Sequence, residues 1–219
     1  MFRDRADAAR QLATELRQLR LHHPLILAIP RGGVVTGAVL ATELGGELDV
    51  VLSRKLRAPF QPELALGAIA ESGDVYLSPY AFETDGVSEE YLRQEQEHQL
   101  AEIARRKKLF RQVRPAASVT GRCVIVTDDG IATGSTMMAA LKIVRAQQPS
   151  ALIVAVPVAP RGQVQAFEAL CDRLVCLESP VEFWSVGAFY ENFPTVEDEQ
   201  VIELLTSCTA KTKAAAARQ

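Results

Sequence analysis

The chain lacks long hydrophobic runs and has no excess of either charge. Its longest apolar stretches, 25–30 and 151–160, fall far short of the roughly 20 residues that a membrane-spanning helix needs, and the charged segment 2–10 does not fit a signal peptide. The 24 lysines and arginines against 27 aspartates and glutamates give a net charge of −3, which argues against a basic nucleic-acid-binding protein. We therefore expect a cytoplasmic protein without a membrane or nucleic-acid partner.

Cysteine is scarce and unpaired in sequence. The four cysteines are Cys123, Cys171, Cys176 and Cys208. None belongs to a CxxC pair and the three histidines lie elsewhere, so we expect reduced core thiols rather than a zinc site. A chain of 219 residues that is 48% hydrophobic can bury a core without metals or disulfides. We predict one domain over 1–206, with a flexible tail at 207–219.

Short apolar runs alternate with helix-length segments along most of the chain. The predicted strands are 25–29, 48–53, 123–127, 151–158 and 174–177, and the predicted helices between them are 34–44, 135–147 and 162–171. A strand–helix–strand order implies parallel pairing with right-handed crossovers. The predicted fold class is therefore α/β, with a parallel sheet flanked by helices and a core of about 22–178.

Three segments lie outside this alternation. Segment 54–73 contains four prolines and glycines among mixed charges and predicts a long loop or weak hairpin, of a length that is usually functional or mobile. Segment 88–114 predicts a charged helix, whose basic run at 105–108 we interpret as a solvated face. The aromatic-rich segment 179–206 predicts a small hood, to which an N-terminal helix at 4–21 is a candidate contributor.

The segment 124–136, VIVTDDGIATGST, carries the clearest chemistry. An apolar strand ends in Asp128 and Asp129, and small residues then lead into a helix. Backbone N–H groups at that helix start, with the helix dipole, form a phosphate cradle, and Gly134 allows an anion to approach the backbone. Two carboxylates would repel the phosphate unless they accept hydrogen bonds from sugar hydroxyls or help to hold Mg²⁺.

Other interpretations of this segment fit less well. A P-loop requires a lysine directly after Gly134, and no GxGxxG pattern occurs here. A receiver-like domain would need an acceptor aspartate at the end of a later strand, whereas Ala159 and Pro160 follow the run 151–158. An ordinary polar turn after a strand stays open as an alternative.

Segment 124–136 resembles the 5-phosphoribosyl diphosphate (PRPP) loop of type I phosphoribosyltransferases. The resemblance implies that Asp128 and Asp129 bind the ribose hydroxyls. The residues implied to wrap the 5′-phosphate are Ala132, Thr133, Gly134, Ser135 and Thr136. The residues implied to form a pyrophosphate loop, with a cis peptide at Pro30–Arg31, are Arg31, Gly32 and Gly33. An ordinary turn is the alternative for the two glycines.

The same resemblance assigns roles elsewhere in the chain. Segment 54–73 is similar to the family's flexible catalytic loop, with Arg54 and Lys55 at its base and Glu63 or Glu71 as proton-transfer groups. Three further candidates are a base-stacking aromatic residue, an acidic metal ligand beside Asp128 and Asp129, and a pyrophosphate-side arginine; these are Trp184, Glu191 and Arg161. Burial in the core is the alternative for Trp184, and a plain helix start is the alternative for Arg161.

The sequence departs from the 6-oxopurine enzymes of this family. Ala132 replaces a loop aspartate and Pro157 replaces a base-reading lysine, so we do not expect hypoxanthine or guanine as the acceptor. The resemblance implies transfer of a phosphoribosyl group from PRPP, with Mg²⁺, to a nitrogen of an unidentified nucleobase-like acceptor, by a homodimer. The alternatives are a non-catalytic PRPP- or nucleotide-sensing regulator and a phosphohydrolase-like metal site.

Overall fold

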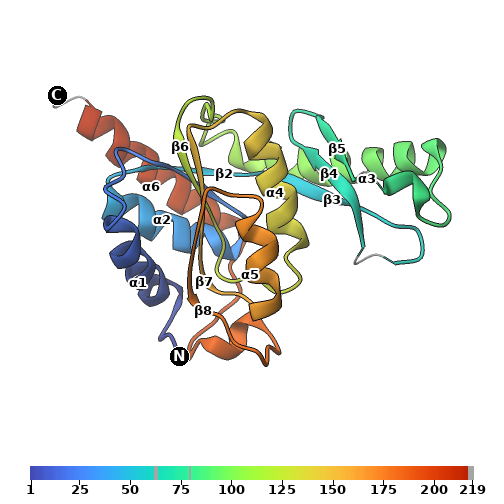
Figure 1. Cartoon of the computed structure of the whole chain (residues 1–219). Helices are drawn as coiled ribbons and strands as arrows, with labels where there is room; N and C mark the ends of the chain where they lie inside the picture. The colour runs from blue at the N-terminus through green and yellow to red at the C-terminus, as the bar shows by residue number, and fades with distance from the viewer. Residues whose placement is uncertain (62–63, 79, 217–219) are drawn as a thin grey trace.

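A five-stranded parallel sheet forms the centre of the protein. The computed structural model describes residues 1–61, 64–78 and 80–216, and the strand order in this sheet is β2-β1-β6-β7-β8 (Figure 1). The strands are β1 (Leu25–Ala28), β2 (Glu47–Val50), β6 (Cys123–Thr127), β7 (Ala151–Val158) and β8 (Arg173–Glu178). All four pairings are parallel, which confirms the predicted fold class.

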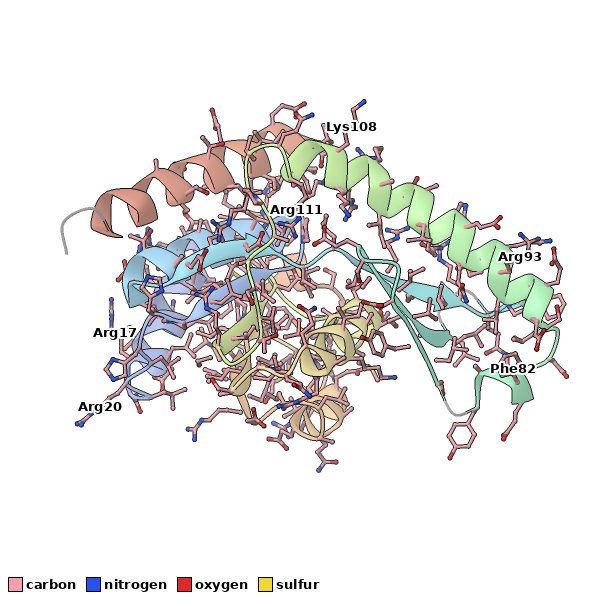
Figure 2. The ribbon with its side chains drawn as sticks, turned by 90° about the horizontal axis from the view of Figure 1, so that it is seen from above. Arg17, Arg20, Phe82, Arg93, Lys108 and Arg111 are labelled. Atoms are coloured by element: carbon pink, nitrogen blue, oxygen red, sulfur yellow. The ribbon has the colours of Figure 1, made fainter. Side chains whose placement is uncertain are left out.

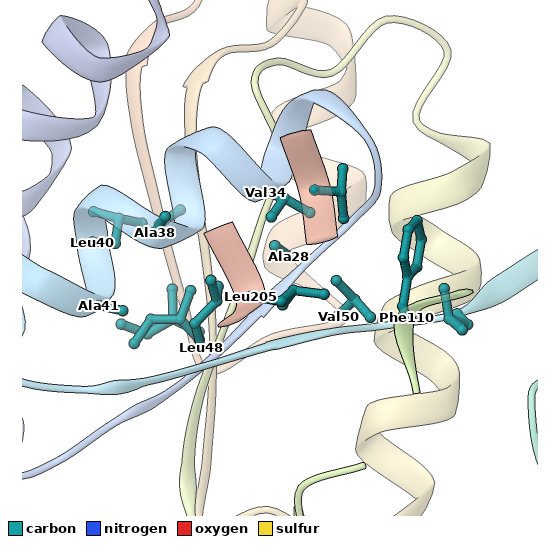
Figure 3. Packing of buried hydrophobic residues seen from close by; sticks show 14 of the residues in the cluster. Ala28, Val34, Ala38, Leu40, Ala41, Leu48, Val50, Phe110 and Leu205 are labelled. Atoms are coloured by element: carbon teal, nitrogen blue, oxygen red, sulfur yellow. The ribbon is translucent and has the colours of Figure 1, made fainter. Parts of the chain in front are cut away.

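Helices cover both faces of this sheet because its strands are apolar on both sides. In β1, Ile26 and Ala28 join one buried cluster, whereas Leu25 and Leu27 join another. The helices that cover this first face are α1 (Arg5–Arg17), α2 (Gly32–Leu44) and α6 (Asp198–Ala216). The second face is covered by α4 (Ser135–Ala146) and α5 (Arg161–Glu168). Figure 3 shows part of the first cluster, with Leu205 and Leu48 among its labelled residues.

A three-stranded antiparallel sheet and a long helix form an arm beside the central sheet (Figures 1 and 2). The arm contains β3 (Ser53–Arg57), β4 (Ala65–Ala70), β5 (Val75–Leu77) and α3 (Glu89–Phe110), with a short 3₁₀ turn at Ala81–Glu83 before α3. The prediction of a long loop was therefore wrong, and the weak hairpin is part of a true sheet. Leu56, Leu66 and Ile69 bury its apolar side, while residues of α3 accept hydrogen bonds from the Arg54 side chain and the Arg57 backbone N–H.

The C-terminal segment is more helical than predicted. A 3₁₀ turn at Val186–Phe189 lies in the predicted hood, and α6 continues to Ala216, so a flexible tail that starts at 207 is wrong. Val201, Leu205 and Cys208 are all buried, and their spacing continues one apolar stripe past the predicted boundary. Within the ranges described, no helix combines the length and apolar character needed to cross a bilayer.

Candidate functional site

The acidic pair lies between the first turns of two helices at the carboxyl edge of the sheet. Asp128 and Asp129 directly follow β6, and the Ile29 N–H donates to the carbonyl oxygen of Thr127 at 2.9 Å, which joins the ends of β1 and β6. Helix α2 begins at Gly32, whereas the sequence predicted a loop there and a helix start at residue 34. The peptide bond Pro30–Arg31 is cis, as the resemblance implied.

The two glycines at the start of α2 let the helix press directly on the acidic pair. A Cβ on Gly32 would lie 1.9 Å from Oδ2 of Asp129, and a Cβ on Gly33 would lie 2.9 Å from the Cα of Asp128. Any side chain at either position would therefore displace the acidic pair. The structure brings together the two motifs that lie about a hundred residues apart in sequence.

The environment of Asp128 opposes a second negative charge. Its carboxyl is half-buried, and its Oδ1 accepts a hydrogen bond from the Asp129 N–H at 2.8 Å. Burial and the neighbouring charge of Asp129 raise the pKa of Asp128 well above its usual range. A bound cation or hydroxyl donors near this carboxyl would stabilise its charged form.

Asp129 is already held by a residue that the sequence analysis missed. The Nε of Arg5 donates to its Oδ2 at 2.7 Å, and the Arg5 Nη1 donates to the Pro194 carbonyl at 2.7 Å. The Arg5 guanidinium also lies 3.7 Å from the centre of the Phe193 ring, a cation–π contact. Arg5 therefore neutralises and orients Asp129 from helix α1. An arginine on the apolar face of an amphipathic helix was the available signal, but its partner was not readable from the sequence.

The predicted hood also contacts the acidic pair. The Tyr190 hydroxyl donates to the Asp129 carbonyl at 2.5 Å, and burial raises the pKa of Tyr190, so the phenol stays a neutral donor. Val186 packs where a Cβ on Gly130 would lie, with 2.5 Å between them. Phe2 contacts the Tyr190 ring at a centroid distance of 5.4 Å. The N-terminus and the hood together support the backbone of the acidic pair.

The loop after the acidic pair presents an accessible helix start. Gly134 precedes α4 with a φ of +78°, a conformation that favours glycine. Ala132, Thr133 and Thr136 are exposed, whereas Gly134 rests on Phe167. The N–H groups and exposed hydroxyls at this helix start form the electropositive environment that anions prefer.

The predicted cationic residues lie in different settings. Arg31 pairs with Glu197 at 3.0 Å, and both side chains are exposed. Arg161 is exposed at the start of α5, where its Nε lies 3.4 Å from the Ser179 carbonyl oxygen. Lys55 lines a cavity of about 250 Å³ beside Pro30 and Thr136.

The two proton-transfer candidates are Glu63 and Glu71, and the structure describes only the second of them. Glu63 lies outside the described residues. Glu71 forms an ion pair with Arg111 at 2.6 Å, and Arg111 in turn pairs with the buried Asp49. Glu71 therefore takes part in an ion-pair network with Arg111 and Asp49, and its assignment as a proton-transfer group stays a prediction.

The two C-terminal candidates, Trp184 and Glu191, are both exposed but differ in what the structure says of their roles. Trp184 is 89% exposed, so burial in the core is excluded and its ring is available for stacking. Glu191 is exposed and its backbone N–H donates to the Phe2 carbonyl. Among the residues that the structure describes, no three His, Cys, Asp or Glu side chains gather closely enough to hold a metal ion. The three-carboxylate metal site predicted from Glu191, Asp128 and Asp129 is therefore not assembled.

The remaining donors still suit Mg²⁺ in its common binding mode. Mg²⁺ usually keeps several waters and takes one or two protein carboxylates plus substrate oxygens. Asp128 supplies such a carboxylate, and the charge of Asp129 next to it accounts for part of its raised pKa. Asp128 would hold the ion, and Arg5 occupies one oxygen of Asp129.

The chain is similar to several known proteins. The family model of the phosphoribosyl transferase domain matches residues 2–191. A Mycobacterium tuberculosis protein, provisionally named a phosphoribosyl transferase, is 40% identical over 205 residues, which cover 94% of this chain and 46% of that protein. The crystal structure of TT1426 from Thermus thermophilus is 44% identical with a TM-score of 0.90, covering 94% of this chain and 98% of that one.

These similarities identify the class of protein. The chain belongs to the phosphoribosyl transferase domain family. It spans about half the length of the curated relatives that it matches.

Proposed function

We propose that this protein transfers the 5-phosphoribosyl group of PRPP to a nitrogen of a nucleobase-like acceptor and releases pyrophosphate. The observation that carries the proposal is the contact of Gly32 and Gly33 with Asp128 and Asp129. This contact places the start of α2, the carboxylates of Asp128 and Asp129, and the start of α4 in that order along one polar edge of the sheet. A sugar with a phosphate at one end and a diphosphate at the other matches that order.

The acidic pair and the start of α4 would hold the phosphoribosyl group. Asp128 accepts hydrogen bonds from ribose hydroxyls, and Arg5 keeps Asp129 oriented for the same task. The N–H groups of 133–136 and the nearby hydroxyls bind the 5′-phosphate, helped by the dipole of α4. Fixing both ends of the sugar places its C1 atom for displacement.

The leaving diphosphate would meet the start of α2 and the cationic residues. Exposed ion pairs such as Arg31–Glu197 are worth little, so Arg31 can exchange Glu197 for a diphosphate at low cost. Lys55 and Arg161 are the other proposed donors. In the reaction the C1–oxygen bond breaks with its electron pair going to pyrophosphate, and the acceptor nitrogen forms the new bond to C1. Donors aimed at the leaving group stabilise the charge that develops there.

Magnesium and the acceptor complete the proposal. Mg²⁺, when bound by Asp128, would supply positive charge to the oxygens of the substrate. The exposed ring of Trp184 would stack on the acceptor base, while Phe183 and Phe189 of the same hood already stack on each other at 5.5 Å. As the single tryptophan of the chain, Trp184 reports acceptor binding by fluorescence.

The test is release of pyrophosphate from PRPP, with Mg²⁺, against a panel of purine, pyrimidine and related bases. We expect release with at least one base, loss of release in Asp128→Asn, and quenching of Trp184 emission by that base. Asp172→Asn is the matched control, because this carboxylate pairs with Arg145 at the opposite end of α4 from the acidic pair. PRPP binding without turnover against every base would instead identify a sensor. Phosphate release without PRPP binding would identify a hydrolase.

A further inference from the structure

A cavity of about 250 Å³ lies between the arm and the loop after β1, and among the residues that the structure describes, every charged residue that lines it is positive. Its floor includes Pro30 and Thr136, which belong to the two proposed anion-binding loops. Its basic residues are Arg54, Lys55 and Arg57 of β3 and Arg106 of α3. The cavity therefore adjoins the carboxyl edge of the sheet, where the acidic pair lies, and continues from it toward the arm.

Arg106 is the unexpected member of this lining. It lies one turn after the buried Ile103 on the same face of α3, and its side chain is half-buried rather than solvated. The interpretation of the basic run at 105–108 as a solvated face is thus wrong for this residue. Its neighbour Arg105, by contrast, has a carboxylate partner, Asp198, with which it pairs at 3.0 Å.

The charges around Arg106 are mostly of its own sign. Burial lowers the pKa of Arg106, and the nearby charges of Arg54, Arg105 and Arg31 lower it further, with Asp198 opposing them. Within the described ranges no carboxylate forms an ion pair with Arg106, and Asp198 pairs through its Oδ2 with Arg105. A guanidinium stays charged at any ordinary pH, so its burial among cations is unfavourable until an anion arrives.

Two further polar residues, Arg54 and Ser53, line the same cavity. The Nε of Arg54 donates at 2.9 Å to Oε1 of Gln99, a fully buried residue of α3, so α3 also fixes the second arginine. The Gln99 amide is itself oriented by Glu95, to which it donates at 2.9 Å. Ser53 lines the same cavity, and its buried hydroxyl has no hydrogen-bond partner among the described groups.

We propose that Arg106 of helix α3 is an anion-binding residue of this site that contacts the diphosphate of the substrate and the released pyrophosphate. The proposal rests on the proposed function for the identity of the anion. Arg54 and Ser53 complete the binding surface. Helix α3, which lies outside the central sheet and its flanking helices, thereby becomes part of the site.

The test is calorimetric titration of the purified protein with inorganic pyrophosphate in the presence of Mg²⁺. A charge-assisted hydrogen bond is worth about 1.5–3 kcal/mol, so Arg106→Gln should weaken binding by about 10- to 100-fold. Arg106→Lys should recover part of the affinity. Arg105→Gln is the matched control and should stay within about twofold of the wild type, because Arg105 has its own carboxylate.

A second measurement separates binding from a structural role. Removing Arg106 relieves like-charge repulsion, so the ligand-free Arg106→Gln protein should melt at or above the wild-type temperature while it binds pyrophosphate more weakly. A lowered melting temperature with unchanged pyrophosphate affinity would overturn the proposal. Absence of pyrophosphate binding in the wild type would also overturn it.

The same titration distinguishes this proposal from the proposed function. If no base is turned over but pyrophosphate binding still depends on Arg106, the anion site stands and the transferase assignment fails. If the wild type transfers phosphoribosyl groups and Arg106→Gln leaves both pyrophosphate affinity and the KM for PRPP unchanged, the transferase stands and Arg106 is not part of its site.

Discussion

Gly32 shows how the acidic pair depends on a missing side chain. A methyl group there would lie 1.9 Å from the Asp129 oxygen that Arg5 holds, so Gly32→Ala must move the carboxylate or the helix start. We expect a stability loss of about 1–3 kcal/mol from overpacking and weaker PRPP binding. Calorimetric titration with PRPP and thermal unfolding measure the two effects.

Gly162 provides the control for that substitution. It lies in α5 with nothing near the position of an added Cβ and without a positive φ. Gly162→Ala should leave PRPP binding unchanged and raise stability by up to about 1 kcal/mol, the usual advantage of alanine in a helix. Equal effects of the two substitutions would show that the glycine contact is not specific to the acidic pair.

Glu47 is expected to make the free energy of unfolding depend on pH in a defined direction. Although burial raises its pKa, hydrogen bonds and charges from Arg114 and Arg122 hold the pKa below its ordinary value of 4.5. A lowered folded-state pKa contributes stability that is complete above the ordinary value and lost as the pH falls through the folded value. Glu47→Gln should therefore lose about 1.5–3 kcal/mol at neutral pH and converge with the wild type in acid.

Chemical unfolding at a series of pH values measures this difference directly. Glu97→Gln is the control, because its carboxylate is 64% exposed and its helical pair with Arg93 is worth only about 0.3–0.5 kcal/mol. A Glu47→Gln deficit that persists unchanged in acid would assign the effect to packing instead.

Whether a site residue could be predicted from the sequence depends on how close in sequence its partners lie. Asp128, Asp129 and Gly134 lie in one short motif whose physical role is readable from neighbouring residues. Arg5 was missed because its carboxylate partner lies 124 positions away, and a single sequence holds no trace of that pairing. Arg106 was misread because a run of basic residues looks the same whether its members face solvent or a cavity.

Among the elements, α3 is fastened to both sheets by one buried network. Arg111, directly after α3, pairs with Asp49 of β2 and with Glu71 just beyond β4, each at 2.6 Å. The Asp49 side chain is only 2% exposed, and burial raises its pKa even beside this arginine. Arg111→Met would leave that carboxyl buried without its counterion, which typically costs about 3–5 kcal/mol.

Denaturant unfolding of Arg111→Met at neutral pH measures that cost. Arg93→Met is the matched control, since Arg93 also binds two glutamates but on the exposed face of α3. Its loss should be below about 1 kcal/mol. Similar losses in the two variants would mean that burial adds nothing to the network around Arg111.

Whether a strand could be predicted from the sequence depends on where in the sequence its packing and hydrogen-bonding partners lie. The strands of the central sheet are apolar on both faces, so β6 and β7 were predicted at the residues where they occur. Strand β3 reads as polar in sequence, and its partners lie some 40 positions later: the Arg54 side chain donates to Gln99, and the Arg57 backbone N–H donates to Glu95. Such a strand becomes recognisable only once α3 is placed against it.

At the scale of the whole molecule, α6 connects the central sheet to the arm. It packs on α2 and β2 and also on α3, and Leu205 is fully buried in the same cluster as Phe110 of α3 (Figure 3). One continuous cluster that spans both parts predicts that they unfold together. The chain should behave as one cooperative unit rather than as a sheet with a loosely attached arm.

Leu205→Ala tests that cooperativity. Truncation of a fully buried leucine costs about 2–5 kcal/mol, and Glu203→Ala, on the exposed side of α6, should cost less than about 0.5 kcal/mol. Amide hydrogen exchange, followed on peptides from β4 and from β7, should accelerate by the same factor in both, at least about 30-fold where exchange requires global unfolding. Acceleration confined to β7 would show that the arm is stabilised independently, and that α6 does not couple the proposed pyrophosphate cavity to the central sheet.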